Sequence, residues 1–163
     1  MTPSDNRIAP ELDLMILAFP MHLAWEFLQA PLFRTMQDAS HMDGIRICLQ
    51  AALGDMAIVL AAFWAASVLA GTREWVARPR RPTVAVWLAV GLVATMAIEF
   101  YSTEVAGRWT YGESMPRLPL IGTGLAPVVQ WIVVPLLVLW YMQRLTAKAA
   151  GSNLANRQTD DGA

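Results

Sequence analysis

Cysteine, histidine and charged side chains are all scarce in this chain of 163 residues. Cys48 is the only cysteine, which excludes a disulfide framework and a thiolate metal cage. Two histidines are too few to supply the axial ligand pairs of a dihaem protein. A net charge of −1 leaves no basic face for phosphates, so a nucleic acid is not expected as a partner.

Hydrophobic residues dominate the composition. They make up 56% of the chain, charged residues make up 15%, and mean hydropathy is +0.41, far from an average soluble domain. Four apolar stretches cover residues 12–33, 45–70, a segment from residue 83 without charge until Glu99, and 125–142. Each reaches the ~20 residues that a helix needs to cross ~30 Å of hydrocarbon. We predict an all-α integral membrane four-helix bundle over residues 1–146 and a disordered polar tail over 147–163.

The basic residues predict the orientation. With four spans, the N-terminus, the second loop and the C-terminus lie on one side, and they hold eight of the 12 basic residues. The positive-inside rule then places both termini in the cytoplasm, in a multi-pass protein of the plasma membrane (the inner membrane of a bacterium). The run at 78–82, RPRRP, is part of this signal, with a lipid-headgroup or partner site as the alternative. Four tryptophans near predicted helix ends are typical of interfacial anchors: Trp75, Trp87, Trp109 and Trp140.

Polar residues interrupt every apolar stretch. His22 and Glu26 share one helix face in the first stretch, and Asp55, Glu99 and Gln130 interrupt the other three. An ionisable group at the centre of a membrane helix costs roughly 2.5–3.5 kcal/mol on insertion scales, so such residues mark function. The predicted topology places all five in the middle or outer half of the bilayer. We therefore expect one cavity between the helices, open outward and closed inward.

The predicted third loop is too rich in turn formers and aromatic residues for a plain linker. It contains GRWTYG at 107–112, MPRLP at 115–119 and GTG at 122–124. We expect this loop to roof the cavity, with four residues covering a substrate or binding its headgroup: Arg108, Trp109, Tyr111 and Arg117. An interfacial loop with anchoring aromatic residues is the alternative interpretation.

Acids, a histidine and aromatic rings in an apolar cavity suit proton transfer to a lipid. An acid can protonate a double bond, a histidine can relay the proton, and an aromatic face can stabilise the carbocation. We expect isomerisation or cyclisation of a lipophilic isoprenoid or sterol-like substrate, without a cofactor or a metal. The partner would be a membrane lipid or lipophilic small molecule, and homo-oligomerisation stays open. The candidate catalytic residues are Glu26, His22, Asp55 and Glu99. The candidate substrate-binding residues are Trp25, Gln29, Gln50, Gln130, Trp131, Arg108, Trp109 and Tyr111.

Three short segments carry a resemblance to a known family. The pair His22-x-x-x-Glu26 resembles the His-x-x-x-Glu of the emopamil-binding protein (EXPERA) superfamily, a four-helix membrane fold that includes sterol Δ8-Δ7 isomerases. EFYSTE at 99–104 is similar to its acidic, tyrosine-containing third span. QWIVVP at 130–135 is similar to its Asn-x-x-Trp-x-x-x-Pro last span, although the amide here directly precedes the tryptophan. The resemblance implies that Glu26 donates the proton, His22 orients it and Trp131 stabilises the cation. Small membrane terpene or carotenoid cyclases, which also use intramembrane acids, are a comparable analogy.

Three other classes of function stay open. A proton-coupled transporter or channel would use the acids as a relay, although the apolar inner half argues against a continuous path. A metal site would combine His22, Glu26, Asp55 and Glu99, but the chain has no Glu-x-x-His motif. A non-enzymatic accessory or assembly subunit would use the polar residues to fix helix packing.

Overall fold

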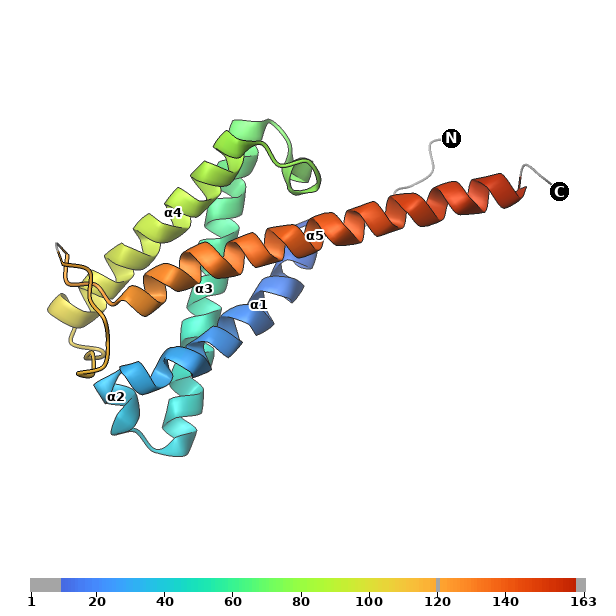
Figure 1. The fold of residues 1–163 in the computed structure, drawn as a ribbon. Helices are drawn as coiled ribbons and strands as arrows, with labels where there is room; N and C mark the ends of the chain where they lie inside the picture. The colour runs from blue at the N-terminus through green and yellow to red at the C-terminus, as the bar shows by residue number, and fades with distance from the viewer. Residues whose placement is uncertain (1–9, 120, 161–163) are drawn as a thin grey trace.

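Four long helices form most of the structure, a computed structural model that describes residues 10–119 and 121–160. They are α1 (Pro10–Gln29), α3 (His41–Ala70), α4 (Arg81–Phe100) and α5 (Leu125–Asp160), drawn in Figure 1. The shorter elements are η1 (Ala30–Leu32), α2 (Arg34–Gln37), η2 (Arg73–Ala77) and the π-helix η3 (Tyr101–Val105). Within the described residues, β structure is limited to two isolated bridges. The predicted all-α class is confirmed.

Three of these helices are long and apolar enough to cross a membrane: His41–Ala70, Arg81–Val105 and Leu125–Thr146. Each contains a window with a mean hydropathy of 1.9. The length and composition of these helices confirm the prediction of a membrane protein. Helix α1 is not among the three, and its 20 residues include Glu11, Asp13 and Glu26. The fourth span stays a prediction.

Local signals in the sequence set the ends of α3 and the start of α4. The Ser40 hydroxyl caps α3 by accepting a hydrogen bond from the Asp43 N–H at 3.2 Å. Gly71 ends the helix with φ of 69°, in the left-handed region that favours glycine. Pro82 lies in the first turn of α4, where its missing N–H costs nothing. As a result, α3 and α4 are joined by a short connection that contains η2.

The hydrophobic core lies between the four long helices, mostly toward the end that carries η2. Helices α1 and α4 each pack against both α3 and α5. Arg73 in η2 donates a hydrogen bond to Glu11 at 3.0 Å, which ties the start of α1 to the α3–α4 connection. The largest fully buried apolar side chains are Trp87, Trp131, Phe63, Leu14, Val59 and Val138. This end of the helices is therefore closed by packed apolar side chains.

Two of the tryptophans predicted at an interface lie in this core instead. Trp75 is 3% exposed, and its indole N–H donates a hydrogen bond to the Ser67 hydroxyl at 3.1 Å. The Trp87 ring lies edge-on to it, with ring centroids 5.5 Å apart. Helix η2 packs against α3 and α5, so an indole near a helix end is turned inward. The interfacial prediction is wrong for both residues: Trp75 lies in a connection that folds back onto the helices, and Trp87 lies on the face of α4 that contacts Trp75.

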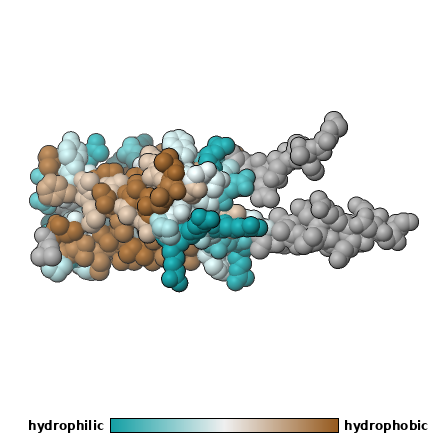
Figure 2. Space-filling view, turned by 90° about the horizontal axis from the view of Figure 1, so that it is seen from above, coloured by the Kyte–Doolittle hydropathy of each residue, from teal (hydrophilic) through white to brown (hydrophobic). Residues whose placement is uncertain are grey.

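The outside of the helices is apolar. Val68 is 84% exposed, Leu28 75% and Leu53 60%. Figure 2 shows hydrophobic residues as a band along the helices, with hydrophilic residues gathered toward its ends. Exposed apolar surface on this scale is unfavourable in water and favourable in hydrocarbon.

Helix α5 continues to Asp160, over residues for which the composition predicts a disordered tail. Residues 147–150 read AKAA, and alanine and lysine have high helix propensity. Extending an existing helix also avoids the cost of nucleating a new one.

Gly91 allows α4 to approach Trp131 of α5 closely. A Cβ atom at this position would lie 2.3 Å from Cε3 and 2.6 Å from Cζ3 of Trp131. We therefore expect Gly91→Ala to lower the free energy of unfolding by ~1–3 kcal/mol, the usual cost of overpacking a core. Thermal unfolding in detergent measures this effect.

Gly54→Ala is the matched control, because a Cβ on Gly54 meets no atom within 4 Å. Its Tm should stay at or above that of the wild type. Equal Tm values for the two variants would contradict the close contact between Gly91 and Trp131.

Candidate functional site

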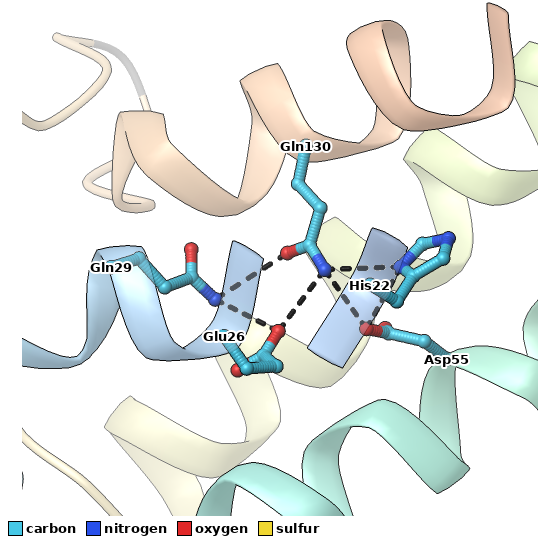
Figure 3. A network of polar contacts seen from close by, with 5 residues as sticks. All are labelled: His22, Glu26, Gln29, Asp55 and Gln130. Carbon is cyan, nitrogen blue, oxygen red and sulfur yellow. Dashed lines mark hydrogen bonds and ion pairs between the residues drawn. The ribbon is translucent and has the colours of Figure 1, made fainter. Parts of the chain in front are cut away.

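Five polar side chains from three helices meet in one hydrogen-bonded group, which we call the polar cluster (Figure 3). His22, Glu26 and Gln29 come from α1, Asp55 from α3 and Gln130 from α5. His22 Nδ1 lies 3.1 Å from Asp55 Oδ2. The Gln130 amide nitrogen lies 3.0 Å from each of these two atoms and 3.1 Å from Glu26 Oε1. Gln130 is therefore the centre of the cluster and connects all three helices.

Gln29 extends the polar cluster along α1. Its amide nitrogen donates a hydrogen bond to Glu26 Oε1 at 2.9 Å and a longer one to Gln130 Oε1 at 3.4 Å. Helical spacing explains why His22, Glu26 and Gln29 contribute together, because residues three and four apart share a face. One oxygen of Glu26 thus accepts from two amides.

The sequence suggests a direct pair between His22 and Glu26, and the structure corrects this. His22 bonds to Asp55, which is 33 positions away in the chain. The described hydrogen bonds of Glu26 come from Gln29 and Gln130, with none from the imidazole. Residues at i and i+4 lie near each other on a helix, but a partner on a facing helix can still approach more closely.

The donors and acceptors of the polar cluster can be matched by counting the N–H groups of Gln130 and His22. The Gln130 amide has two N–H groups and three acceptor atoms within reach. If the neutral His22 carries its proton on Nδ1, it donates to Asp55, and the amide donates to Glu26 and Asp55. Both carboxyl groups are then satisfied. Nε2 of His22 is buried and has no hydrogen-bond partner within the described part of the chain.

A second polar pair lies on α4 and the following loop. The Tyr111 hydroxyl donates a hydrogen bond to Glu99 Oε2 at 2.5 Å. Burial, and then the hydrogen bond to Glu99, raise the pKa of Tyr111 well above its usual value of 10.0. The phenol is therefore protonated at neutral pH and can act as a donor. Arg117 lies over the tyrosine ring, 5.0 Å from its centroid.

The loop of residues 106–124 is held against the segment that follows α1. Gly112 N–H donates to the Leu32 carbonyl at 2.8 Å, and Arg34 N–H donates to the Thr110 carbonyl at 2.9 Å. The Phe33 and Tyr111 rings are in contact, with centroids 5.5 Å apart. These bonds fix the loop over the end of the helices opposite to η2.

A cavity of about 730 Å³ lies between the polar cluster, Glu99 and this loop. The volume is in the usual range for small-molecule sites. The sequence-predicted residues that line it are Glu26, Gln29, Gln50, Asp55, Glu99, Arg108, Trp109, Gln130 and Trp131. His22 lies behind the wall, where its ring packs against Trp131 with centroids 5.1 Å apart. Tyr111 reaches the cavity through Glu99, and Trp25 is not part of the lining.

Several residues of the cavity wall are absent from the sequence prediction. Thr95 and Ser102 flank Glu99 on its face of α4 and η3, as their spacing in the sequence predicts, although they are not among the candidate site residues. Cys48 and Phe33 also line the cavity, and nothing in the sequence marks them out. The π-helix η3 begins directly after α4, and such turns are frequent at functional sites.

The carboxyl groups around the cavity are not arranged as a metal site. Among the side chains that the structure describes, in residues 10–119 and 121–146, there is no group of three or more His, Cys, Asp and Glu that could hold a metal ion. The amide of Gln130 occupies the position between His22, Glu26 and Asp55 where a cation would have to bind. The metal-site alternative therefore has no support in the described geometry.

Comparison with protein-family models gives no match for this chain, and comparisons with curated proteins and with solved structures give none either.

The roof of the cavity gives a testable expectation. Tyr111→Phe removes the donor to Glu99 and keeps the ring that packs on Phe33. A typical hydrogen bond contributes about 0.5–1.5 kcal/mol, so we expect the loop to open more often and trypsin to cut faster at Arg108 and Arg117. Gel analysis of limited proteolysis in nanodiscs measures the rate. Tyr141→Phe, on the exposed surface of α5, should cleave like the wild type. Unchanged cleavage of Tyr111→Phe would show that this hydrogen bond does not hold the roof.

Proposed function

We propose that this chain is a membrane enzyme that isomerises or cyclises a lipophilic, unsaturated isoprenoid or sterol-like substrate by proton transfer. One observation carries the proposal: Glu26 and Asp55, bridged by Gln130, line a cavity of about 730 Å³ together with Trp131. Acid, base and aromatic ring are the groups that protonation and deprotonation of a double bond require.

In the proposed reaction, Glu26 donates a proton to one carbon of a double bond. The resulting carbocation lies against the Trp131 ring, whose negative face attracts the charge. Asp55 takes a proton from a neighbouring carbon, so the double bond moves and the substrate keeps its composition. Gln130 holds both carboxyl groups, each within 3.1 Å of its amide nitrogen, and His22 orients Asp55. In a cyclisation, the same cation is attacked by a second double bond before the proton is lost.

The resemblance to the EXPERA superfamily is part of this proposal. It assigns the same roles to Glu26 and Trp131. It also pairs His22 with Glu26, whereas in the structure His22 is hydrogen-bonded to Asp55. The four-span arrangement with both termini in the cytoplasm is also proposed. The bond between Glu11 and Arg73 supports it, because it brings the start of α1 to the side of the α3–α4 connection.

A proton-coupled transporter is less well supported. The core toward η2 contains closely packed apolar side chains such as Phe63, Trp87 and Val138. A proton or ion path needs polar groups or water in this region. An accessory subunit is the second candidate, and one observation favours it: Gln130 satisfies every carboxyl group of the polar cluster, as a purely structural network would.

Lipid analysis of expressing cells distinguishes the enzyme from the accessory subunit. An isomerase or cyclase changes the chromatographic retention of its substrate without changing the exact mass. We expect a lipid of shifted retention and unchanged mass in cells that make the wild type, and its absence with Glu26→Gln. Identical lipid profiles at matched protein levels would contradict the proposed activity.

A further inference from the structure

The cavity has an opening on the side of the molecule, between α3 and α4. Five residues line the cavity and are also exposed on the surface: Arg108 of the loop, and four on the side of the helices, Gln50 and Gly54 of α3, Ile98 of α4 and Tyr101 of η3. Ile98 is 46% exposed and Tyr101 is 54% exposed. A residue that belongs both to the wall and to the surface marks the mouth of a cavity.

This mouth lies at hydrocarbon depth. Gly54 is about 24 Å from the end of α3 at Ala70, and Ile98 is about 26 Å from the start of α4 at Arg81, at 1.5 Å per residue. Both residues lie inside helices that can cross a membrane. The two helices separate from their connection in Figure 1, and a Cβ on Gly54 would meet no atom within 4 Å. The opening therefore faces lipid tails.

Helix α4 and η3 also bring two hydroxyl groups without a partner to the cavity wall. Thr95 is 6% exposed and Ser102 is fully buried, and both line the cavity. Neither hydroxyl makes a hydrogen bond to any residue that the structure describes. Thr103, by contrast, donates to the Glu99 carbonyl at 2.9 Å, as hydroxyls in helices usually do. A buried hydroxyl without a hydrogen bond is costly, so this pair fits an external acceptor or donor.

We infer that the cavity binds a bilayer lipid with one neutral oxygen function, a hydroxyl or a carbonyl, which hydrogen-bonds to Thr95 and Ser102. Its hydrocarbon tail leaves between α3 and α4. The headgroup is neutral because Arg108 is the only cationic residue among the described lining, against three carboxyl groups. This inference rests on the proposed function for the reaction, and it adds the class of substrate and its route.

Binding of labelled all-trans-farnesol to the full chain in nanodiscs tests the oxygen site. Unlabelled farnesol and the hydrocarbon farnesene are compared as competitors. We expect the wild type to prefer farnesol about tenfold, the effect of two ordinary hydrogen bonds. The double variant Thr95→Val, Ser102→Ala should reduce this preference to within about twofold. Thr103→Val is the matched control and should keep it. An equal preference in the wild type and the double variant, or no farnesol binding by the wild type, would overturn the inference.

The route has its own test. Gly54→Trp fills the mouth, and we expect it to weaken farnesol binding at least about tenfold. Leu53→Trp changes the neighbouring residue, which is 60% exposed and outside the cavity lining, and should leave binding unchanged. Equal affinities in both variants would overturn the lateral route.

Glu26→Gln separates this inference from the proposed function. It should bind farnesol with the wild-type preference while losing lipid conversion. If the Thr95/Ser102 variant loses the preference for farnesol while cellular lipids are unchanged by the wild type, the binding site is supported and the proposed enzymatic activity is contradicted.

Discussion

Replacing Glu26 with glutamine is expected to lower the rate of lipid conversion by a factor of about 10²–10⁴, the usual contribution of a general acid. The amide keeps the size of the side chain and can still contact Gln29 and Gln130, but it has no proton to give to a double bond. The effect should therefore fall on the chemical step. Single-turnover conversion by purified protein measures this rate, using the lipid identified in expressing cells.

Glu104→Gln is the matched control for this change. Glu104 lies in η3, one turn beyond Glu99, and is exposed. It should convert lipid at the wild-type rate and have the same Tm. If the Glu26→Gln protein folds normally and retains more than about a tenth of the activity, Glu26 is not the general acid.

Replacing Gln130 with leucine is expected to have the largest effect on stability. The volume is nearly kept, but Glu26 and Asp55 lose a shared donor and Gln29 loses an acceptor. Each buried group left unsatisfied costs about 1–3 kcal/mol, although hydrogen bonds between membrane helices often contribute less. We expect a loss of about 2–4 kcal/mol in total and a fall in Tm of roughly 5–15 °C.

Gln143→Leu serves as the comparison on the same helix. Gln143 is half-buried and donates one hydrogen bond, to the Leu139 carbonyl at 3.3 Å. Its replacement should shift the Tm by no more than about 2–4 °C. If thermal unfolding gives the same shift for both variants, Gln130 is not the centre of a coupled network.

The sequence predicts the polar cluster well because two simple constraints act on it. Helical spacing places His22, Glu26 and Gln29 on one face, and the cost of polar groups in lipid turns that face inward. Counting residues from the helix ends then brings Asp55 and Gln130 to a similar depth. Their direct hydrogen bonds agree with this prediction.

The exact partners inside the cluster cannot be predicted in this way. Spacing alone favours His22 with Glu26, while the facing helix supplies Asp55 at 3.1 Å. The rotation of α3 about its axis decides between them, and it depends on how α3 packs against α1 and α4. Sequence periodicity does not contain that information.

The surroundings of Trp75 and Thr95 are two further features that the sequence does not predict. Trp75 is buried because η2 folds back onto α3 and α5. The path of the α3–α4 connection determines this burial, and the periodicity of the helices does not. Thr95 is four residues before Glu99 and so shares its helix face, yet the lack of a hydrogen-bond partner for its hydroxyl is known only when its neighbours are placed. Spacing indicates which side chains share a face, and tertiary packing determines which of them keep a free hydrogen-bonding group.

Deuterium transfer to lipid is the most direct measurement of the central claim, that the polar cluster moves protons on a lipid inside the membrane. Purified wild type in nanodiscs, supplied with lipid extract in D₂O, should add one mass unit to an unsaturated isoprenoid lipid as its double bond moves. Glu26→Gln should leave that lipid unlabelled, and Glu104→Gln should label it like the wild type. Equal labelling with the wild type, with Glu26→Gln and with empty nanodiscs would contradict the account.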